Sequence, residues 1–218
     1  MKRVLPIAAL ALLAGCFDEP VPAYKTVAPE TQVYLNDGTL ETLTKEAVYN
    51  VGLVYVEGSG KTNLSARVEK VDFNTISYLN LDRNALTNVD VLADFHGLKW
   101  LRLNGNALSD LPELPKLKNL RRVYLADNRL KSVPEALKRL PSLTDVDLSG
   151  NPIEAVPEWF ALLKGMDSIS LSRTKVKSLP ENISSWRSLK TLQMGDLDLS
   201  EDEMKRIRAA LPLTRVVF

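Results

Sequence analysis

The sequence has very little of the side-chain chemistry that most catalytic and metal sites need. Its 218 residues include one cysteine and one histidine, which excludes a disulfide framework and a Cys/His zinc site and leaves little for histidine catalysis. An excess of one charge is also missing, because 28 Lys and Arg stand against 27 Asp and Glu. The net charge of +1 excludes the global positive charge that drives binding to nucleic acids or anionic membranes. Any charged binding site must therefore be a local patch.

The amino terminus has the pattern of a secretory signal peptide. Met1-Lys2-Arg3 is a short basic start, and the almost wholly apolar run that follows ends in Leu13-Ala14-Gly15-Cys16. This run is too short to cross a bilayer as a mature helix of about 20 residues. Its last four residues resemble a bacterial lipobox, which implies lipidation of the Cys16 sulfur and removal of residues 1–15. The alternative is a free thiol in an ordinary signal peptide or membrane anchor.

Residues 16–31 are predicted to form a lipidated, proline-rich tether. Pro20, Pro22 and Pro29 lie among few apolar residues, a composition that favours extended polyproline II at about 3.1 Å per residue. Residue two of the lipidated chain would be Phe17 rather than Asp, which in enterobacterial-type lipoproteins resembles release to the outer membrane. We therefore expect a lipid-anchored protein of the bacterial cell envelope, at the outer membrane.

From residue 76 the chain repeats itself every 22 or 23 residues. Six apolar residues open successive units: Ile76, Leu98, Leu120, Leu143, Met166 and Leu189. Residues 120–142 and 143–165 both match L-x-x-L-x-L-x-x-N-x-L-x-x-[LV]-P-x-x-[LF]-x-x-L-x-x. This pattern resembles the leucine-rich repeat family, and the match covers residues 76–199. The resemblance implies an α/β solenoid, with a curved parallel β-sheet on its concave face and short 3-10 or extended segments on its convex face.

Position nine of the repeat is expected to be structural. It holds an asparagine in the first four units: Asn84, Asn106, Asn128 and Asn151. An amide both donates and accepts, so it can satisfy backbone groups that lose their ladder partners where the chain leaves each strand. Thr174 and Leu197 stand at this position in the last two units, where the pattern decays.

Both ends of a repeat array expose apolar surface and need a cover. Residues 200–218 are predicted to form a C-terminal cap, in which Ser200 and Glu203 make a capping box that opens a helix to about Leu211. Three further residues repeat the one-four-six spacing as a last half unit: Leu213, Val216 and Phe218. Turn-separated strand patterns in residues 32–75 indicate a β-rich N-terminal cap.

The outward strand positions are where the repeat leaves residue identity free. Positions two, three, five, seven and eight point away from the core, and in the first three units they supply Tyr78, Asn80, Lys99, Trp100, Arg102, Arg121, Arg122 and Tyr124. Strands about 4.8 Å apart would gather these side chains into one aromatic and basic patch, with Asp145 and Asp147 in an acidic patch beside it. Because Trp, Tyr and Arg dominate binding energy at interfaces, we interpret this face as a protein-binding surface. The alternative is a solvated face whose charges pair across strands.

No motif indicates catalysis. Gly58-Ser59-Gly60-Lys61-Thr62 is similar to the end of a phosphate-binding loop, but the first glycine of that motif would be residue 55, which is Tyr. His96 has no Ser or Cys nucleophile spaced around it in a recognisable way. We therefore expect no enzyme, no cofactor, no metal, no nucleic-acid partner and no small-molecule substrate.

Two functions remain open at this point. The favoured one is a non-catalytic, membrane-anchored lipoprotein that acts as a protein-binding scaffold in the cell envelope. The other is a surface-exposed adhesin or virulence-type effector that binds a host or neighbour-cell protein, because the Val/Leu-Pro-Glu turns at residues 133–135, 156–158 and 179–181 resemble the LPX subclass of bacterial leucine-rich repeats.

Overall fold

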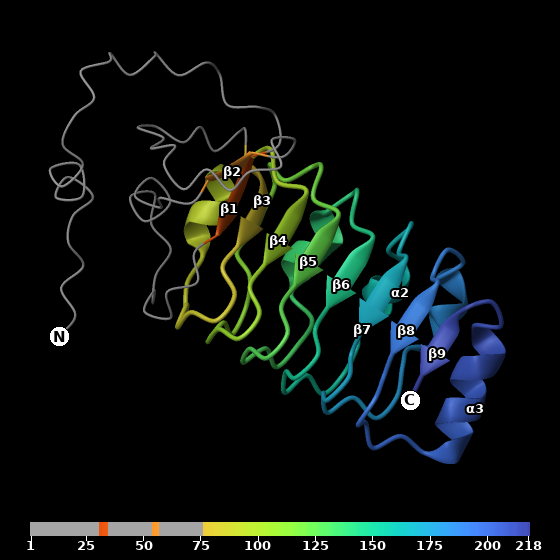
Figure 1. Ribbon diagram of the computed structural model, residues 1–218. Helices are drawn as coiled ribbons and strands as arrows, with labels where there is room; N and C mark the ends of the chain where they lie inside the picture. The colour runs from red at the N-terminus through yellow and green to blue at the C-terminus, as the bar shows by residue number, and fades with distance from the viewer. Residues whose placement is uncertain (1–30, 35–53, 57–75) are drawn as a thin grey trace, which may run out of the picture.

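The computed structural model describes residues 31–34, 54–56 and 76–218. One nine-stranded sheet runs through them in the order β2-β1-β3-β4-β5-β6-β7-β8-β9 (Figure 1). Neighbouring strands are parallel, apart from the antiparallel pair of β1 and β2. The strands are β1 (Thr31–Tyr34), β2 (Val54–Val56), β3 (Ile76–Asn80), β4 (Trp100–Arg102), β5 (Arg122–Tyr124), β6 (Asp145–Asp147), β7 (Ser168–Ser170), β8 (Thr191–Gln193) and β9 (Arg215–Val217).

The strand register follows the period of the sequence. Position three of each unit lies beside position three of the next, in the series Tyr78, Trp100, Arg122, Asp145, Ser168 and Thr191. The same alignment holds for the inward residues at position four, from Leu79 in β3 to Leu192 in β8. The predicted parallel sheet and its repeating register are thus confirmed.

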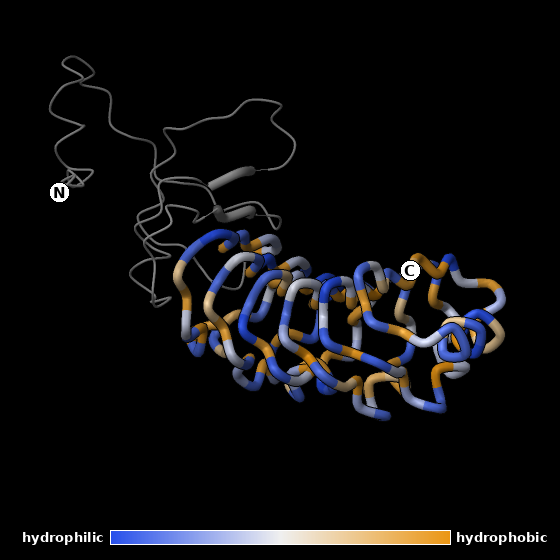
Figure 2. Tube along the Cα trace, turned by 90° about the horizontal axis from the view of Figure 1, so that it is seen from below, coloured by the Kyte–Doolittle hydropathy of each residue, from blue (hydrophilic) through white to orange (hydrophobic). Residues whose placement is uncertain are grey.

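The core is a column of apolar side chains between the sheet and the outer arc of each coil. The six residues that open the units are all at most 3% exposed. Short helices cover the arc: η2 (Asp90–Asp94), η3 (Glu135–Arg139), α2 (Glu158–Ala161) and η4 (Glu181–Ser185). Trp186 is buried against them and donates from Nε1 to the Phe160 carbonyl at 3.1 Å. Figure 2 shows the resulting stack of coils.

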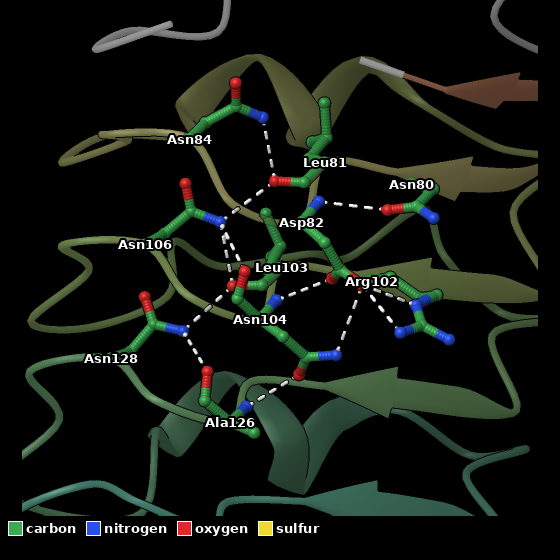
Figure 3. A network of polar contacts seen from close by, with 10 residues as sticks. All are labelled: Asn80, Leu81, Asp82, Asn84, Arg102, Leu103, Asn104, Asn106, Ala126 and Asn128. Atoms are coloured by element: carbon green, nitrogen blue, oxygen red, sulfur yellow. Dashed lines mark hydrogen bonds and ion pairs between the residues drawn. The ribbon is translucent and has the colours of Figure 1, made fainter. Parts of the chain in front are cut away.

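The position-nine asparagines bind the turns of adjacent coils (Figure 3). Asn106 donates from Nδ2 to the carbonyls of Leu81 and Leu103, both at 2.9 Å, and its Oδ1 accepts from the Leu86 N–H at 3.1 Å. Asn128 and Asn151 repeat this arrangement one and two units further along. Each amide therefore satisfies buried backbone groups of two successive units.

The C-terminal helix begins as the sequence indicates. Helix α3 (Glu201–Ala210) starts after Ser200, whose Oγ accepts from the Glu203 N–H at 3.2 Å. The Glu203 carboxylate does something that a capping box does not predict, because its Oε1 accepts from the Leu179 N–H at 2.8 Å and so reaches into the fifth unit. Figure 1 places α3 at the opposite end of the array from β1 and β2.

The expected inward position of Leu213 is wrong. Its side chain is 93% exposed, whereas Leu211 is 4% exposed and lies in the core. The Thr214 N–H donates to the Leu211 carbonyl at 3.2 Å, so a tight turn separates α3 from β9. This turn directs Leu213 outward before the chain rejoins the sheet at Arg215.

The amino-terminal predictions fall mainly outside the described residues. The signal peptide, Cys16 and the tether up to residue 30 lie there, as does most of the predicted cap over residues 32–75. Within that cap, β2 pairs with β1, and β1 adds to β3 at the first edge of the array. Among the described residues, no helix is both long and apolar enough to cross a membrane.

Candidate functional site

Position three of the first four units forms a stacked row on the outward face of the sheet. The rings of Tyr78 and Trp100 have centroids 5.5 Å apart and are tilted by 56°. From the next strand, the Arg122 guanidinium lies over the Trp100 ring, with Cζ 4.2 Å from the ring centroid. Arg122 Nε is in turn 3.5 Å from Asp145 Oδ2. Four adjacent strands thus present an aromatic, aromatic, cationic and anionic side chain in one line.

Position five adds a second cation and ring. Arg102 holds Asp82 through Nη2 at 2.6 Å and Nε at 2.8 Å, and its Cζ is 5.5 Å from the Tyr124 centroid. Burial opposes the charge of this guanidinium, but the hydrogen bond and attraction from Asp82 outweigh it and raise the pKa of Arg102 above its usual value. Arg102 is therefore a fixed cation on this face.

A polar network behind Arg102 fixes its position (Figure 3). Asp82 Oδ1 accepts from the Asn104 N–H at 2.8 Å, and the Asp82 N–H donates to Asn80 Oδ1 at 2.9 Å. Asn104 Oδ1 accepts from the Ala126 N–H at 2.8 Å, which extends the network into the third unit. Asp82 and Asn104 were not predicted as site residues, although both stand at position seven, which is one of the outward positions.

The predicted site residues differ in how far they reach solvent. Asn80 is only 9% exposed, and its Oδ1 accepts from the Asp82 N–H. It therefore holds Asp82 in position and contributes little exposed surface of its own. Trp100 is 38% exposed, and Lys99 and Arg121 are exposed beside it. Tyr124 is half-buried; burial raises the pKa of its hydroxyl, against the opposing charge of Arg122. The solvent-facing part of the patch is therefore centred on Trp100.

The acidic patch lies on β6 and is held by hydroxyl groups. Asp145 Oδ2 accepts from Thr144 Oγ1 at 2.6 Å, and Asp147 Oδ1 accepts from Ser149 Oγ at 2.6 Å. Both carboxylates are half-buried. On β7 the outward side chains become small, with Ser168 and Ser170. The outward side chains thus change from bulky and basic on β4 and β5 to acidic on β6 and small on β7.

Position eight of every unit has a left-handed backbone. Its φ lies between 55° and 67° in the described units, at Arg83, Gly105, Asp127, Gly150, Arg173 and Asp196. Asp127 reaches across Gly150 to Arg173, with Oδ1 3.2 Å from Nη2. A side chain at residue 150 would displace the Asp127 carboxylate, so glycine at this position leaves room for the ion pair between Asp127 and Arg173.

Comparisons with known proteins agree with this architecture. Residues 96–135 and 118–160 match the family model described as leucine-rich repeats in two copies. A leucine-rich repeat protein of Leptospira interrogans is similar at 26% identity, with a TM-score of 0.57 over 66% of this chain and 43% of that one. An internalin from Listeria monocytogenes is similar at 20% identity, with a TM-score of 0.58 over 80% of this chain and 49% of that one.

This chain spans less than half the length of each of those two proteins. The comparison with curated proteins returned no match. The family model and both structures nevertheless agree with the parallel, repeating sheet of this chain. Residues 76–218 therefore have the fold of a leucine-rich repeat solenoid.

Proposed function

We propose that this protein is a non-catalytic scaffold that binds a protein partner through the outward face of β3–β6. Leucine-rich repeat proteins are generally protein-interaction scaffolds. The observation that carries the proposal is Trp100, which is 38% exposed and yet is held between Tyr78 and Arg122. A large indole kept at the surface among cations is the type of side chain that dominates binding energy at interfaces.

The fixed geometry of the patch supports this proposal. Arg102 is held by Asp82, and Arg122 lies between the Trp100 ring and Asp145. Side chains that are already ordered lose less conformational entropy when a partner binds, so more of the contact energy becomes affinity. A merely solvated face does not need a tryptophan, because charged side chains alone would keep it soluble.

We further propose that a lipid on Cys16 anchors the scaffold in the bacterial cell envelope, at the outer membrane. The lipobox-like sequence Leu13-Ala14-Gly15-Cys16 supports this, and both structural neighbours come from bacteria. Cys16→Ser is expected to abolish incorporation of radiolabelled palmitate and to release the protein from membrane fractions. Palmitate incorporation that survives this substitution would contradict the anchor.

The binding proposal is tested by crosslinking and capture from native envelopes. A variant with Trp100→Ala and Arg122→Ala is compared with one carrying Leu162→Ala and Arg139→Ala, which removes an exposed apolar and a cationic side chain from the outer arc. Circular dichroism confirms that both fold. We expect the first variant to lose specific partners that wild type and the second retain. Identical capture by all three would place binding elsewhere on the molecule.

A further inference from the structure

The two halves of the outward face are opposite in charge and in side-chain size. On β3–β5, the outward positions two, three, five, seven and eight hold five cationic and two anionic side chains. On β6–β8, the same positions hold two cationic and four anionic side chains. The bulky Tyr78, Trp100 and Tyr124 all lie on the first half, whereas Ser168 and Ser170 lie on the second. A surface divided in this way can be complementary to a reversed copy of itself.

One two-fold axis brings the opposite charges together. An axis parallel to the strands and midway between β5 and β6 lays β5 of one copy on β6 of the other, β4 on β7 and β3 on β8. Because this axis preserves the position within the repeat, Lys99 of one copy opposes Asp167 of the other. By the same rule Arg122 opposes Asp145 and Arg83 opposes Asp196. No outward position of β3–β8 is then opposed by a like charge.

The same axis also matches tall side chains with short ones. Trp100 of one copy lies over Ser168 of the other, and Arg102 lies over Ser170. Both serines are half-buried between their neighbours, so they leave room above the strand. An axis along the array would instead lay each strand antiparallel on its own counterpart. With that axis at position five, Arg102 opposes Arg102, Tyr124 opposes Tyr124 and Asp147 opposes Asp147. Charge and size thus select one of the two arrangements.

We propose that the partner seated on this face is a second copy of the chain, related to the first by the two-fold axis between β5 and β6. The inference rests on the proposed function, because it names the partner of the same surface. A two-fold interface forms each contact twice, so the pairs of Lys99 with Asp167 and of Arg83 with Asp196 each occur twice. Of these four residues, Lys99, Arg83 and Asp196 are exposed. Asp167 is half-buried, and its Oδ2 accepts from Lys190 Nζ of its own chain at 2.9 Å, so Lys99 of the second copy would join this pair.

The size of the face sets the strength of the dimer. Six strands at about 4.8 Å, each contributing about seven residues at about 3.3 Å, span roughly 650 Å² per copy. Specific interfaces bury about 800 Å² per partner, so this one lies near the lower limit. The dimer is expected to be concentration-dependent, with a dissociation constant in the micromolar range.

A charge-exchange experiment tests the dimer. Sedimentation velocity is measured over a concentration series for the full-length protein in mild detergent, and for Lys99→Glu, Asp167→Lys and an equimolar mixture of these two variants. Each single change opposes like charges at two contacts, so each variant is expected to dimerise at least about tenfold more weakly. In the mixture Glu opposes Lys at one contact and Lys99 opposes Asp167 at the other, so dimerisation returns.

Two further variants complete the test. The double variant Lys99→Glu with Asp167→Lys is expected to dimerise like wild type, because each of its contacts again joins opposite charges. Lys131→Glu changes an exposed lysine outside the outward strand positions and is expected to have no effect. A wild type that stays monomeric would overturn the proposal, and so would a mixture that remains as weak as its components.

The outcome separates this inference from the function on which it rests. A monomeric wild type whose envelope partners are lost with Trp100→Ala and Arg122→Ala would refute the second copy and retain the binding face. A dimer that survives both charge reversals would refute this interface. A monomer whose capture is unchanged by the Trp100 and Arg122 substitutions would refute both proposals.

Discussion

The first four repeat units and the last two bind their coils together by different means. In the first four, a buried asparagine amide bonds to the backbone of its own unit and, from the second unit on, to the preceding unit as well. In the fifth unit the Thr174 hydroxyl donates one such bond, from Oγ1 to the Leu171 carbonyl at 2.7 Å. The sixth unit has Leu197 there.

Helix α3 bonds to the backbone of the fifth unit at a different position of the repeat. Arg206 donates from Nη2 to the Leu179 carbonyl at 2.6 Å and to Glu203 Oε1 at 2.8 Å, while Glu203 accepts from the Leu179 N–H. At the end of the array an ion pair thus binds the backbone at Leu179, whereas the neutral amides bind the carbonyl at position six and the N–H at position eleven. The asparagine pattern thus ends in the units next to the cap, where charged side chains of α3 supply other bonds to the backbone.

The largest effect is expected from removing one amide. Asn128→Ala leaves the Leu108 N–H without its acceptor and removes one of the two amide donors from each of the Leu103 and Leu125 carbonyls. This should lower the free energy of unfolding by about 1–3 kcal/mol. Urea denaturation measures this. Thr174→Ala removes one hydrogen bond and is the matched control, with an expected loss of about 1 kcal/mol. Equal losses would remove the distinction between the two regions.

A smaller effect is expected from breaking the link to the cap. Arg206→Met keeps the aliphatic stem and removes the donors to Leu179 and Glu203, so we expect faster hydrogen exchange at the amides of β8 and β9 and a loss of about 1–2 kcal/mol in unfolding free energy. Lys205→Met is the control on the same helix, because the Lys205 ion pairs are exposed and such pairs contribute at most about 0.5 kcal/mol. Unchanged exchange in Arg206→Met would show that the cap is held by apolar contacts alone.

The smallest effect is a dependence on pH. The hydrogen bond from Arg206 lowers the pKa of Glu203, and the Leu179 N–H adds to this against the effect of burial. A carboxyl whose pKa is lower in the folded state stabilises the protein above its unfolded pKa of about 4.3, and this contribution is lost as the pH falls through the folded pKa. The difference in stability between wild type and Glu203→Gln is therefore expected to be full at pH 7 and to shrink below about pH 4.

The asparagine region provides the comparison for this measurement. Amides do not titrate, so the loss caused by Asn128→Ala should be the same at pH 7 and at pH 3 where the protein remains folded. A pH-dependent loss in Asn128→Ala, or a constant one in Glu203→Gln, would contradict the assignment of an ion pair to one region and neutral amides to the other.

Inward residues were predictable because burial fixes their spacing. The residues that open the units, the strand register and the position of Asn128 all follow from the period of 22 or 23 residues. The start of α3 followed from a local signal, since Ser200 is followed three residues later by Glu203. In each case one physical requirement, either burial or a backbone donor without a partner, restricts the choice of residue.

Outward residues were predictable as positions but not as contacts. Nothing in the sequence shows that Arg102 would bind Asp82, twenty residues earlier, or that Asn80 would turn its amide toward Asp82 instead of a partner. Leu213 fits the apolar spacing, yet the turn that follows α3 directs it to solvent. Such contacts depend on side-chain conformations across neighbouring strands, which the repeat period does not determine.

The partial exposure of Trp100 gives the molecule an intrinsic optical reporter. Of the three tryptophans, Trp186 is 2% exposed and Trp159 is half-buried on the outer arc, so Trp100 is the indole most open to an aqueous quencher such as iodide. Its emission is expected to depend on Arg122 as well, because the guanidinium carbon lies 4.2 Å from the ring centre. Any occupant of the outward face, whether a second copy or another protein, would shield this fluorophore and leave the signal of Trp186 unchanged.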